Sequence, residues 1–221
     1  MKNELQRWLT GCLFVCVGCS DASQYSQLKL SGADSIADHI RIDHAFGTVA
    51  IAGSLVCTGD LVMRTGNDFT SEMLEQMCAK DQTYSHCGLV SIENDSIFVY
   101  HAMGGEWNPD KKLCRDPFDL FCNPFENRGI GIYTFHLEPF EKNRLDSIMK
   151  AWYHKGVEFD MDFDLATDDR MYCAEFISKA VELATKKKIK FSTSSIHQFI
   201  YIAPDDLFLN SHCSEKKRFR Y

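Results

Sequence analysis

The residues whose types and spacing could do covalent chemistry lie in two short segments. Residues 84–88 contain His86, and residues 172–175 contain Cys173. The apolar pattern after Cys173 is helical, so this thiol should lie in the first turn of a helix, where unpaired backbone N–H groups and the helix dipole favour the thiolate. A nucleophilic thiolate needs a neighbouring base, and an imidazole can supply one. The two segments therefore predict nucleophilic catalysis by cysteine.

A hairpin supplies a candidate for the third group, which would orient the base. Residues 86–92 and 97–102 have the composition of two strands, joined by a polar turn. With the turn centred on residues 94 and 95, His101 faces Gly88 across the hairpin. His86 and Gly88 share a face of their strand, so His101 should lie on that face too, diagonal to His86. A shift of one residue in register would destroy this arrangement.

Each of these residues also has an ordinary structural interpretation. A cysteine at a helix start is, taken alone, more often a buried packing residue than a nucleophile. His86 and His101 could each be a strand-end histidine bonded to the backbone. Ser85 is typical of a turn, and Glu175 is typical of a first-turn acid that complements the helix dipole. The combination of these residues, rather than any one of them, favours catalysis.

The surrounding elements are those of one domain with helices and strands. Residues 59–63 and residues 130–135 predict strands. Pro139 opens a helix with one apolar face that ends at Gly156, and a second helix follows Cys173. Three segments are predicted to be irregular: residues 20–47, residues 104–128 and the acidic residues 160–170.

The N-terminus has the shape of a secretory signal. Lys2 and Arg7 precede a short apolar stretch, and residues 16–19 resemble a bacterial lipobox, in which Cys19 would become the lipid-modified N-terminus. The stretch is shorter than the roughly 20 residues that a membrane-spanning helix needs. An uncleaved anchor and a buried N-terminal helix are the alternatives. The expected organisation is a lipoprotein signal peptide over residues 1–18, a tether and lead-in over 19–47, and a catalytic domain over 48–221.

The composition limits the classes of partner and of site. Lys and Arg number 24 and Asp and Glu number 31, so the formal net charge is -7, which disfavours nucleic acid as a partner. Three of the ten cysteines lie in the predicted signal and lipobox, and the remaining odd number leaves at least one thiol free. Cys114 and Cys122 are the pair most easily closed into a local disulfide. Because no CxxC and no His-x3-His spacing occurs, no structural metal site is predicted.

Five motifs occur in order between about residue 55 and about residue 210. They are GDLVMR at 59–64, YSHCGLV at 84–90, VYHA at 99–102, FD at 159–160 and YCAEF at 172–176. Together they resemble the YiiX-like permuted papain-like proteins of the NlpC/P60 superfamily, in which the histidine hairpin precedes the cysteine helix. The resemblance implies an α+β, circularly permuted papain-like fold whose antiparallel sheet packs on the nucleophile helix.

The resemblance also implies roles for individual residues. Cys173 would be the nucleophile, His86 the base and His101 the third residue of the triad. The oxyanion would be stabilised by the backbone N–H of Cys173 and by the Tyr172 hydroxyl. The other residues expected to line or support the site are Ser85, Asp60 and Asp160. The reaction implied is acyl transfer through a thioester, without a metal or an organic cofactor.

The signal predicts a lipid-anchored protein of the bacterial cell envelope. At that place the substrate would be an amide or ester of a cell-wall peptide or of a lipid. The alternatives are a lipid acyltransferase and a noncatalytic envelope binding or assembly module that retains the papain-like fold. The sequence does not predict an oligomeric state.

Overall fold

The structure is a computed structural model that describes residues 32–105 and 108–221, with side chains described from residue 40 onward. The predicted signal peptide, the lipidation site Cys19 and the first part of the predicted tether lie outside the described residues. The chain divides into Met1–Ala37 and Asp38–Tyr221, and the fold below is that of the second unit. Among the described helices, none combines the length and the apolarity that crossing a bilayer requires.

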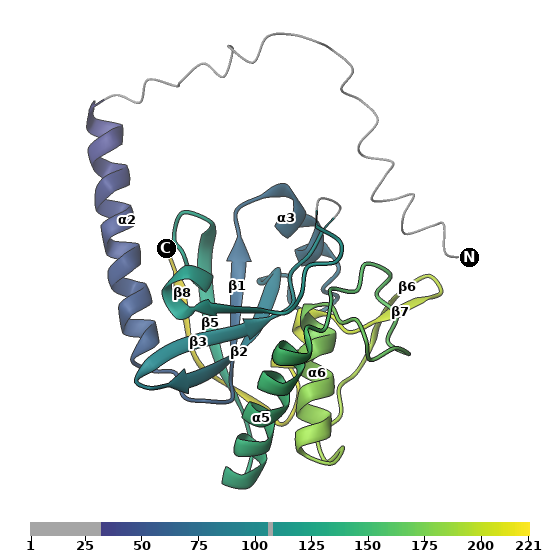
Figure 1. The fold of residues 1–221 in the computed structure, drawn as a ribbon. Helices are drawn as coiled ribbons and strands as arrows, with labels where there is room; N and C mark the ends of the chain where they lie inside the picture. The colour runs from purple at the N-terminus through teal and green to yellow at the C-terminus, as the bar shows by residue number, and fades with distance from the viewer. Residues whose placement is uncertain (1–31, 106–107) are drawn as a thin grey trace. The chain divides into compact units, whose positions relative to one another are not determined.

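A central sheet of antiparallel strands organises the molecule (Figure 1). A strand directs successive side chains to opposite faces, so Leu61 and Met63 of β1 face one apolar core while Val62 faces the other. The sheet is therefore covered by apolar residues on both faces. In spatial order its strands are β4 (Cys114–Pro117), β3 (Ser96–His101), β2 (His86–Glu93), β1 (Asp60–Gly66), β5 (Asn127–Phe135) and β8 (Cys213–Arg220).

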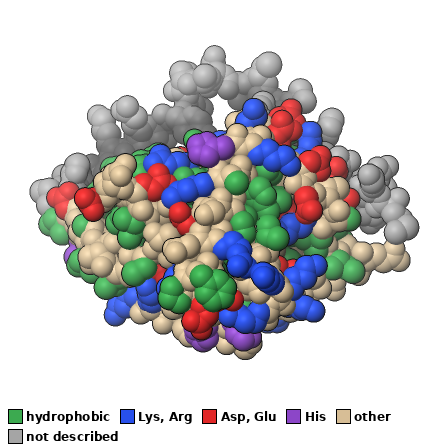
Figure 2. Space-filling model, turned by 60° about the horizontal axis from the view of Figure 1, so that its bottom comes forward, with side chains coloured by type: hydrophobic (Ala, Val, Ile, Leu, Met, Phe, Trp, Pro, Cys, Tyr) green, Lys and Arg blue, Asp and Glu red, His purple; other side chains and the backbone are tan. Residues whose placement is uncertain are grey.

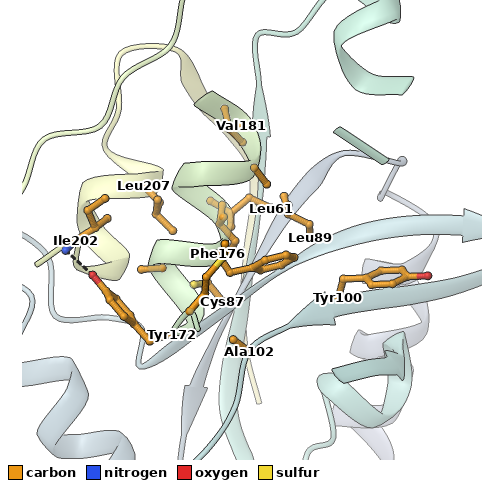
Figure 3. Packing of buried hydrophobic residues seen from close by; sticks show 14 of the residues in the cluster. Leu61, Cys87, Leu89, Tyr100, Ala102, Tyr172, Phe176, Val181, Ile202 and Leu207 are labelled. Atoms are coloured by element: carbon orange, nitrogen blue, oxygen red, sulfur yellow. Dashed lines mark hydrogen bonds between the residues drawn. The ribbon is translucent and has the colours of Figure 1, made fainter. Parts of the chain in front are cut away.

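Helices α5 (Pro139–Lys155) and α6 (Cys173–Ala184) cover one face of this sheet. Phe176 of α6 packs against Leu61 of β1 in a continuous cluster, which Figure 3 shows from close by. Leu145 of α5 belongs to the same cluster and is fully buried. The helices predicted after Pro139 and after Cys173 are thus confirmed, because each presents its apolar stripe to the sheet.

Helices α2 (Gly32–Gly53) and α4 (Phe118–Phe121) bring apolar side chains to the other face. Val49 and Ala52 of α2 pack in a cluster with Val90 of β2. The prediction that residues 20–47 are irregular is therefore wrong from Gly32 onward, and the boundary placed at residue 48 falls inside α2. Between residues 40 and 53 the side chains of Ala45, Val49 and Ala52 are buried, but Ile40, Phe46 and Ile51 are exposed, so the apolar residues do not mark one face and the helical periodicity is weak.

The hairpin of β2 and β3 has the predicted register. Val90 pairs with Val99, as a turn centred on Asn94 and Asp95 requires. Both turn residues have positive φ, 47° and 62°, which is the backbone of a two-residue type I′ turn. This register places His101 on the face of the hairpin that carries His86.

The sequence predicts a loop over residues 104–128, and that prediction is wrong for residues 114–121, which form β4 and α4. Each of these elements has four residues, too few to leave a periodic pattern in the sequence. The acidic segment 160–170 lacks regular secondary structure as predicted, apart from a single β-bridge residue at its end. The predicted class, α+β with an antiparallel sheet, is confirmed. The remaining elements are α3 (Phe69–Gln76), β6 (Ser194–Ile196), β7 (Phe199–Tyr201) and α7 (Pro204–Phe208).

The surface carries both signs of charge. Acidic and basic side chains are interspersed on the face that Figure 2 shows. Strand β8 alone exposes Lys216, Lys217 and Arg218, and the guanidinium of Arg218 lies 2.6 Å from the carboxylate of Glu215. Acidic and basic side chains are therefore mixed on this face, and β8 carries a local row of basic side chains.

Candidate active site

The two histidines of the predicted triad are in direct contact. His86 begins β2 and His101 ends β3. Nε2 of His86 lies 2.9 Å from Nδ1 of His101, and the two rings meet edge to face. Both side chains are buried. The predicted hairpin register therefore places His86 and His101 side by side on one face of the hairpin.

A carboxylate that the sequence analysis missed extends this pair. Oδ2 of Asp116 lies 2.9 Å from Nε2 of His101. Asp116 belongs to β4, where it pairs with Val99, two residues before His101. His86, His101 and Asp116 thus form one hydrogen-bonded chain across three neighbouring strands. The sequence held no signal for it, because β4 is too short to be recognised from its pattern.

An aromatic and a basic side chain surround the chain of histidines. The ring centroid of Phe121 lies 5.7 Å from that of His86 and 5.0 Å from that of His101. Arg64 lies over the Phe121 ring at 4.7 Å and donates a hydrogen bond to the Phe121 carbonyl. Burial, followed by the charge of Arg64, lowers the pKa of His86 well below its ordinary value. Burial also lowers the pKa of His101, against the opposing effect of Asp116. Both imidazoles are therefore neutral at physiological pH.

Cys173 is the first residue of α6, as predicted, and its side chain is partly buried. The pKa of its thiol is lowered, first by a hydrogen bond from the Cys87 thiol and further by the backbone N–H groups of Ala174, Cys87 and Cys173, while burial acts in the opposite direction. The pKa of Cys87, which is fully buried, is raised by that burial and by its contact with Cys173. The pair thus concentrates thiolate character on Cys173.

The strand pleat separates the two halves of the site. Cys87 faces α6 and packs in the cluster that contains Phe176, whereas His86 faces α4 and contacts Phe121. Within the described residues no hydrogen bond joins Cys173 to His86. The polar neighbour of Cys173 is Cys87, the residue that follows His86 in the chain. The structure therefore brings His86 and His101 together, but within the described residues it does not bring Cys173 into hydrogen-bonding contact with either histidine.

Tyr172 precedes the nucleophile helix as its N-cap residue. Its hydroxyl accepts a hydrogen bond of 2.7 Å from the backbone N–H of Ile202, as Figure 3 shows. Its ring lies 4.6 Å from that of Phe163. Burial raises the pKa of the hydroxyl, so it keeps its proton.

Ser85 lies beside His86, but its hydroxyl forms hydrogen bonds with the backbone of the neighbouring strand β1. The hydroxyl oxygen accepts a hydrogen bond of 3.0 Å from the backbone N–H of Gly66 and donates one of 3.3 Å to the carbonyl of Arg64. These contacts hold the start of β2 against β1. Ser85 therefore fixes the backbone from which His86 projects.

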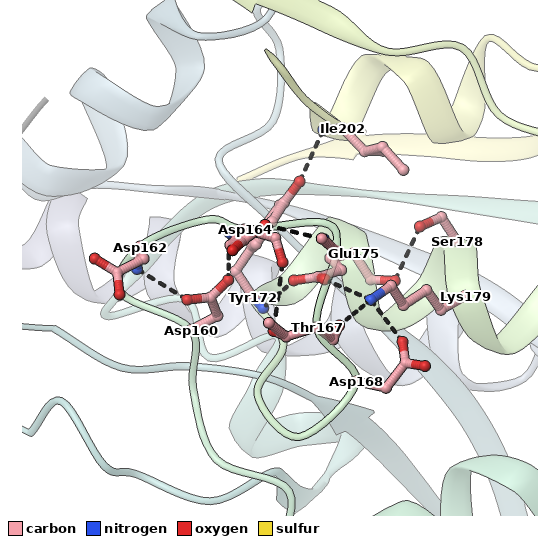
Figure 4. A network of polar contacts seen from close by, with 11 residues as sticks. Asp160, Asp162, Asp164, Thr167, Asp168, Tyr172, Glu175, Ser178, Lys179 and Ile202 are labelled. Atoms are coloured by element: carbon pink, nitrogen blue, oxygen red, sulfur yellow. Dashed lines mark hydrogen bonds and ion pairs between the residues drawn. The ribbon is translucent and has the colours of Figure 1, made fainter. Parts of the chain in front are cut away.

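Asp60 and Asp160 both have structural partners. Asp60 accepts a hydrogen bond of 2.7 Å from the backbone N–H of Cys57 and lies 2.6 Å from the ammonium of Lys216. It is four residues from Arg64 on β1, roughly 13 Å along the strand, and so lies far from the histidine pair. Asp160 accepts hydrogen bonds of 2.9 Å and 2.6 Å from the backbone N–H groups of Asp162 and Asp164 (Figure 4). It thereby shapes the acidic loop before α6.

Glu175 secures the helix start that carries Cys173. Its carboxylate accepts a hydrogen bond of 3.2 Å from the backbone N–H of Tyr172 and lies 2.9 Å from the ammonium of Lys179 (Figure 4). Burial raises the pKa of Glu175 to about 7, although Lys179 and the Tyr172 N–H act in the opposite direction. This carboxyl therefore titrates near neutral pH beside the proposed nucleophile.

The described cysteines are all free thiols, and the local disulfide considered for Cys114 and Cys122 is not present. Within residues 32–105 and 108–221, no group of three or more His, Cys, Asp or Glu side chains is arranged to hold a metal ion. Three of the four ring nitrogens of His86 and His101 are engaged with each other or with Asp116. The histidine pair therefore does not fit a metal centre.

Comparison with known proteins gives a match of fold. No family model matches the sequence, and no curated protein sequence matches it. The fold matches the crystal structure of the metalloprotein YiiX from Escherichia coli O157:H7 with a TM-score of 0.60 and 16% sequence identity, over 74% of this chain and 98% of that chain. The resemblance to the YiiX-like proteins is thus confirmed at the level of the fold, and the chain has the architecture of YiiX.

Proposed function

We propose that this protein is a cysteine hydrolase that cleaves an amide or ester bond through a thioester on Cys173. The observation that carries the proposal is the thiol of lowered pKa at the start of α6, whose contact Cys87 adjoins the hydrogen-bonded chain of His86, His101 and Asp116. A binding module would need neither a thiolate nor an oriented imidazole. The order of the histidine hairpin and the helix that begins with Cys173 supports the proposal of a circularly permuted papain-like fold.

The proposed reaction has two steps. In the first, the Cys173 thiol gives its proton to His86, the resulting thiolate attacks the carbonyl carbon, the C–N or C–O bond breaks, and the leaving group takes that proton from the His86 imidazolium. In the second, water attacks the thioester and gives a proton to His86, the C–S bond breaks, the acid is released, and the proton passes from His86 to the Cys173 sulfur. The oxyanion of each step would be bound by the backbone N–H of Cys173 and the hydroxyl of Tyr172. In the described structure His86 and the helix of Cys173 lie on opposite faces of β2, so the proposal requires a water, or a movement of the His86 side chain at the start of the strand, to carry the proton between them.

The proposed location is the bacterial cell envelope, and the proposed substrate is a peptide or lipid amide or ester found there. This part rests on the lipobox-like sequence at Cys19. A Cys19→Ala variant should leave the membrane fraction, because a diacylated anchor binds far more firmly than the apolar stretch alone. Its hydrolysis of a soluble ester should equal that of the wild type. Retention of the variant in the membrane fraction would argue for an uncleaved anchor instead.

The test of the activity is the covalent intermediate itself. Full-length protein would be mixed with 4-nitrophenyl acetate, quenched in acid and analysed by peptide mass spectrometry for acetyl on Cys173. We expect acetylation of Cys173 in the wild type, none in Cys173→Ala, and a rate about 10²-fold lower in His86→Ala, as expected for loss of an acid–base catalyst. Cys213 is an internal control, because burial raises the pKa of its thiol to about 12.

Two outcomes would count against the proposal. A folded wild-type protein that is never acetylated at Cys173 would favour the noncatalytic envelope module. Acetylation of Cys173 at the same rate in His86→Ala would show that the histidine chain does not serve this thiol. Transfer of the acetyl group to an added alcohol in preference to water would identify an acyltransferase.

A further inference from the structure

We propose that Asp116 sets the direction of the hydrogen bonds through both histidines, so that His86 presents an unprotonated Nδ1 as its proton acceptor. This inference rests on the proposed function, in which His86 is the base. It concerns a positioning residue two hydrogen bonds away from the acceptor atom. The steps run from the edge of the sheet inward.

The first step fixes the proton on His101. The hydrogen bond from His101 lowers the pKa of Asp116, so this side chain is an ionised carboxylate and can only accept hydrogen bonds. Its Oδ2 lies 2.9 Å from Nε2 of His101. Nε2 of His101 must therefore carry a proton and donate it. The reverse arrangement would place two acceptors against each other at that distance.

The second step transmits this choice to His86. A neutral imidazole carries a proton on only one of its nitrogens. His101 is neutral because burial lowers its pKa, so the proton on Nε2 leaves Nδ1 with a free lone pair. Nδ1 of His101 lies 2.9 Å from Nε2 of His86, which must then be the donor. His101 therefore acts as a relay of hydrogen-bond direction.

The third step defines the acceptor. His86 is neutral for the same reason as His101, and its one proton is on Nε2. Nδ1 of His86 is consequently unprotonated, and within the described residues it makes no hydrogen bond. In this state it can accept a proton from a thiol or from water. With the opposite direction along the chain, Nδ1 would carry the proton and His86 could not act as a base.

The other charged groups near the two rings cannot replace Asp116. Arg64 of β1 and Lys111, which precedes β4, both affect the pKa values of His86 and His101. Each is a donor without an acceptor atom, so neither can accept the proton of His101 Nε2. Cys114 of β4 pairs with His101 in the strand register, and burial raises the pKa of its thiol, so it remains uncharged. The direction of the chain therefore depends on one carboxylate.

The test replaces Asp116 with Asn, whose amide can donate to Nε2 of His101 and so permits the reversed direction. The tautomer of His86 would be read from long-range ¹H–¹⁵N correlation spectra of the full-length chain labelled at histidine, with signals assigned by a His86→Asn variant. We expect the wild type to show His86 protonated at Nε2, and Asp116→Asn to populate the form protonated at Nδ1. The rate of Cys173 acetylation should fall by about 10²-fold.

Asp119→Asn is the matched control, because it removes the same charge from an exposed position three residues further on and should leave the His86 tautomer unchanged. A wild-type His86 protonated at Nδ1, or a tautomer unaltered in Asp116→Asn, would overturn the inference. The wild-type measurement can refute the inference even if the variant fails to fold. The tautomer is read without any substrate, so absence of acetylation at Cys173 would refute the proposed function and leave this result standing.

Discussion

The contact between Cys87 and Cys173 makes a quantitative prediction about thiol reactivity. The Cys87 thiol is fully buried and donates a hydrogen bond to the sulfur of Cys173, which is the largest cause of the lowered pKa of Cys173. Cys87→Ala removes the donor and leaves the helix N-terminus in place. Cys87→Ser keeps a donor of similar size at the same position. The two variants therefore separate the hydrogen bond from the other influences on Cys173.

The expected size follows from the strength of such a bond. A hydrogen bond to a charged group contributes roughly 1.5–3 kcal/mol, and one pKa unit corresponds to about 1.4 kcal/mol. A thiol is a weak donor, so the lower end applies, and Cys87→Ala should raise the pKa of Cys173 by about one unit. Cys87→Ser should hold that pKa at or below the wild-type value, because a hydroxyl is the stronger donor.

The assay is the rate of alkylation of Cys173 by iodoacetamide as a function of pH, measured by mass spectrometry of the peptide that contains Cys173. Only the thiolate reacts, so the midpoint of the pH profile gives the pKa directly. A midpoint in Cys87→Ala equal to that of the wild type would refute the role assigned to the thiol pair. A rise in Cys87→Ser as large as that in Cys87→Ala would refute the role of the donor.

Three further predictions concern stability. Gly88→Ala should lower the free energy of unfolding by about 1–3 kcal/mol, measured in urea, because a Cβ there would lie 2.3 Å from Cγ1 of Val99; an unchanged midpoint would contradict the packing. Folding raises the pKa of Glu175 from its ordinary value of 4.5 to about 7. Between these two pH values the folded protein keeps a proton on Glu175 that the unfolded chain releases, so the free energy of unfolding should fall as the pH rises from one to the other. Glu175→Gln should remove that fall, and parallel pH profiles of the two proteins would disprove it. Leu145→Ala should lower the free energy of unfolding by about 2–5 kcal/mol, since Leu145 is fully buried. A loss below about 1 kcal/mol would contradict this expectation, because it would mean that neighbouring side chains fill the cavity left by Leu145.

The hairpin and the nucleophile helix could be predicted because their signals are local. The turn at Asn94 and Asp95 sets the register by itself, and the apolar face of α6 repeats at helical spacing. Asp116 could not be predicted in the same way, since its position depends on a four-residue strand that only tertiary pairing stabilises. Its hydrogen bond to His101 is a non-local contact, and no pattern in the sequence encodes it.

The face of the sheet on which Cys87 lies follows from strand alternation alone. The alternation that puts Gly88 on the face of His86 puts Cys87 on the opposite face. A helix that begins with Cys173 and packs on that opposite face meets Cys87 first. The strand pleat therefore predicts that Cys87, and not His86, faces the helix that begins with Cys173.

The two outermost strands of the sheet end it by different means. Strand β4 is short and closes with Pro117, which has no N–H to offer to another strand. Strand β8 is long but exposes a row of lysine and arginine side chains, and a second copy pairing along it would bring like charges together. Growth of the sheet by edge-to-edge addition is disfavoured on both sides. The outermost strand β4 can therefore carry Asp116, the carboxylate bonded to His101, while its edge remains a poor template for pairing with another chain.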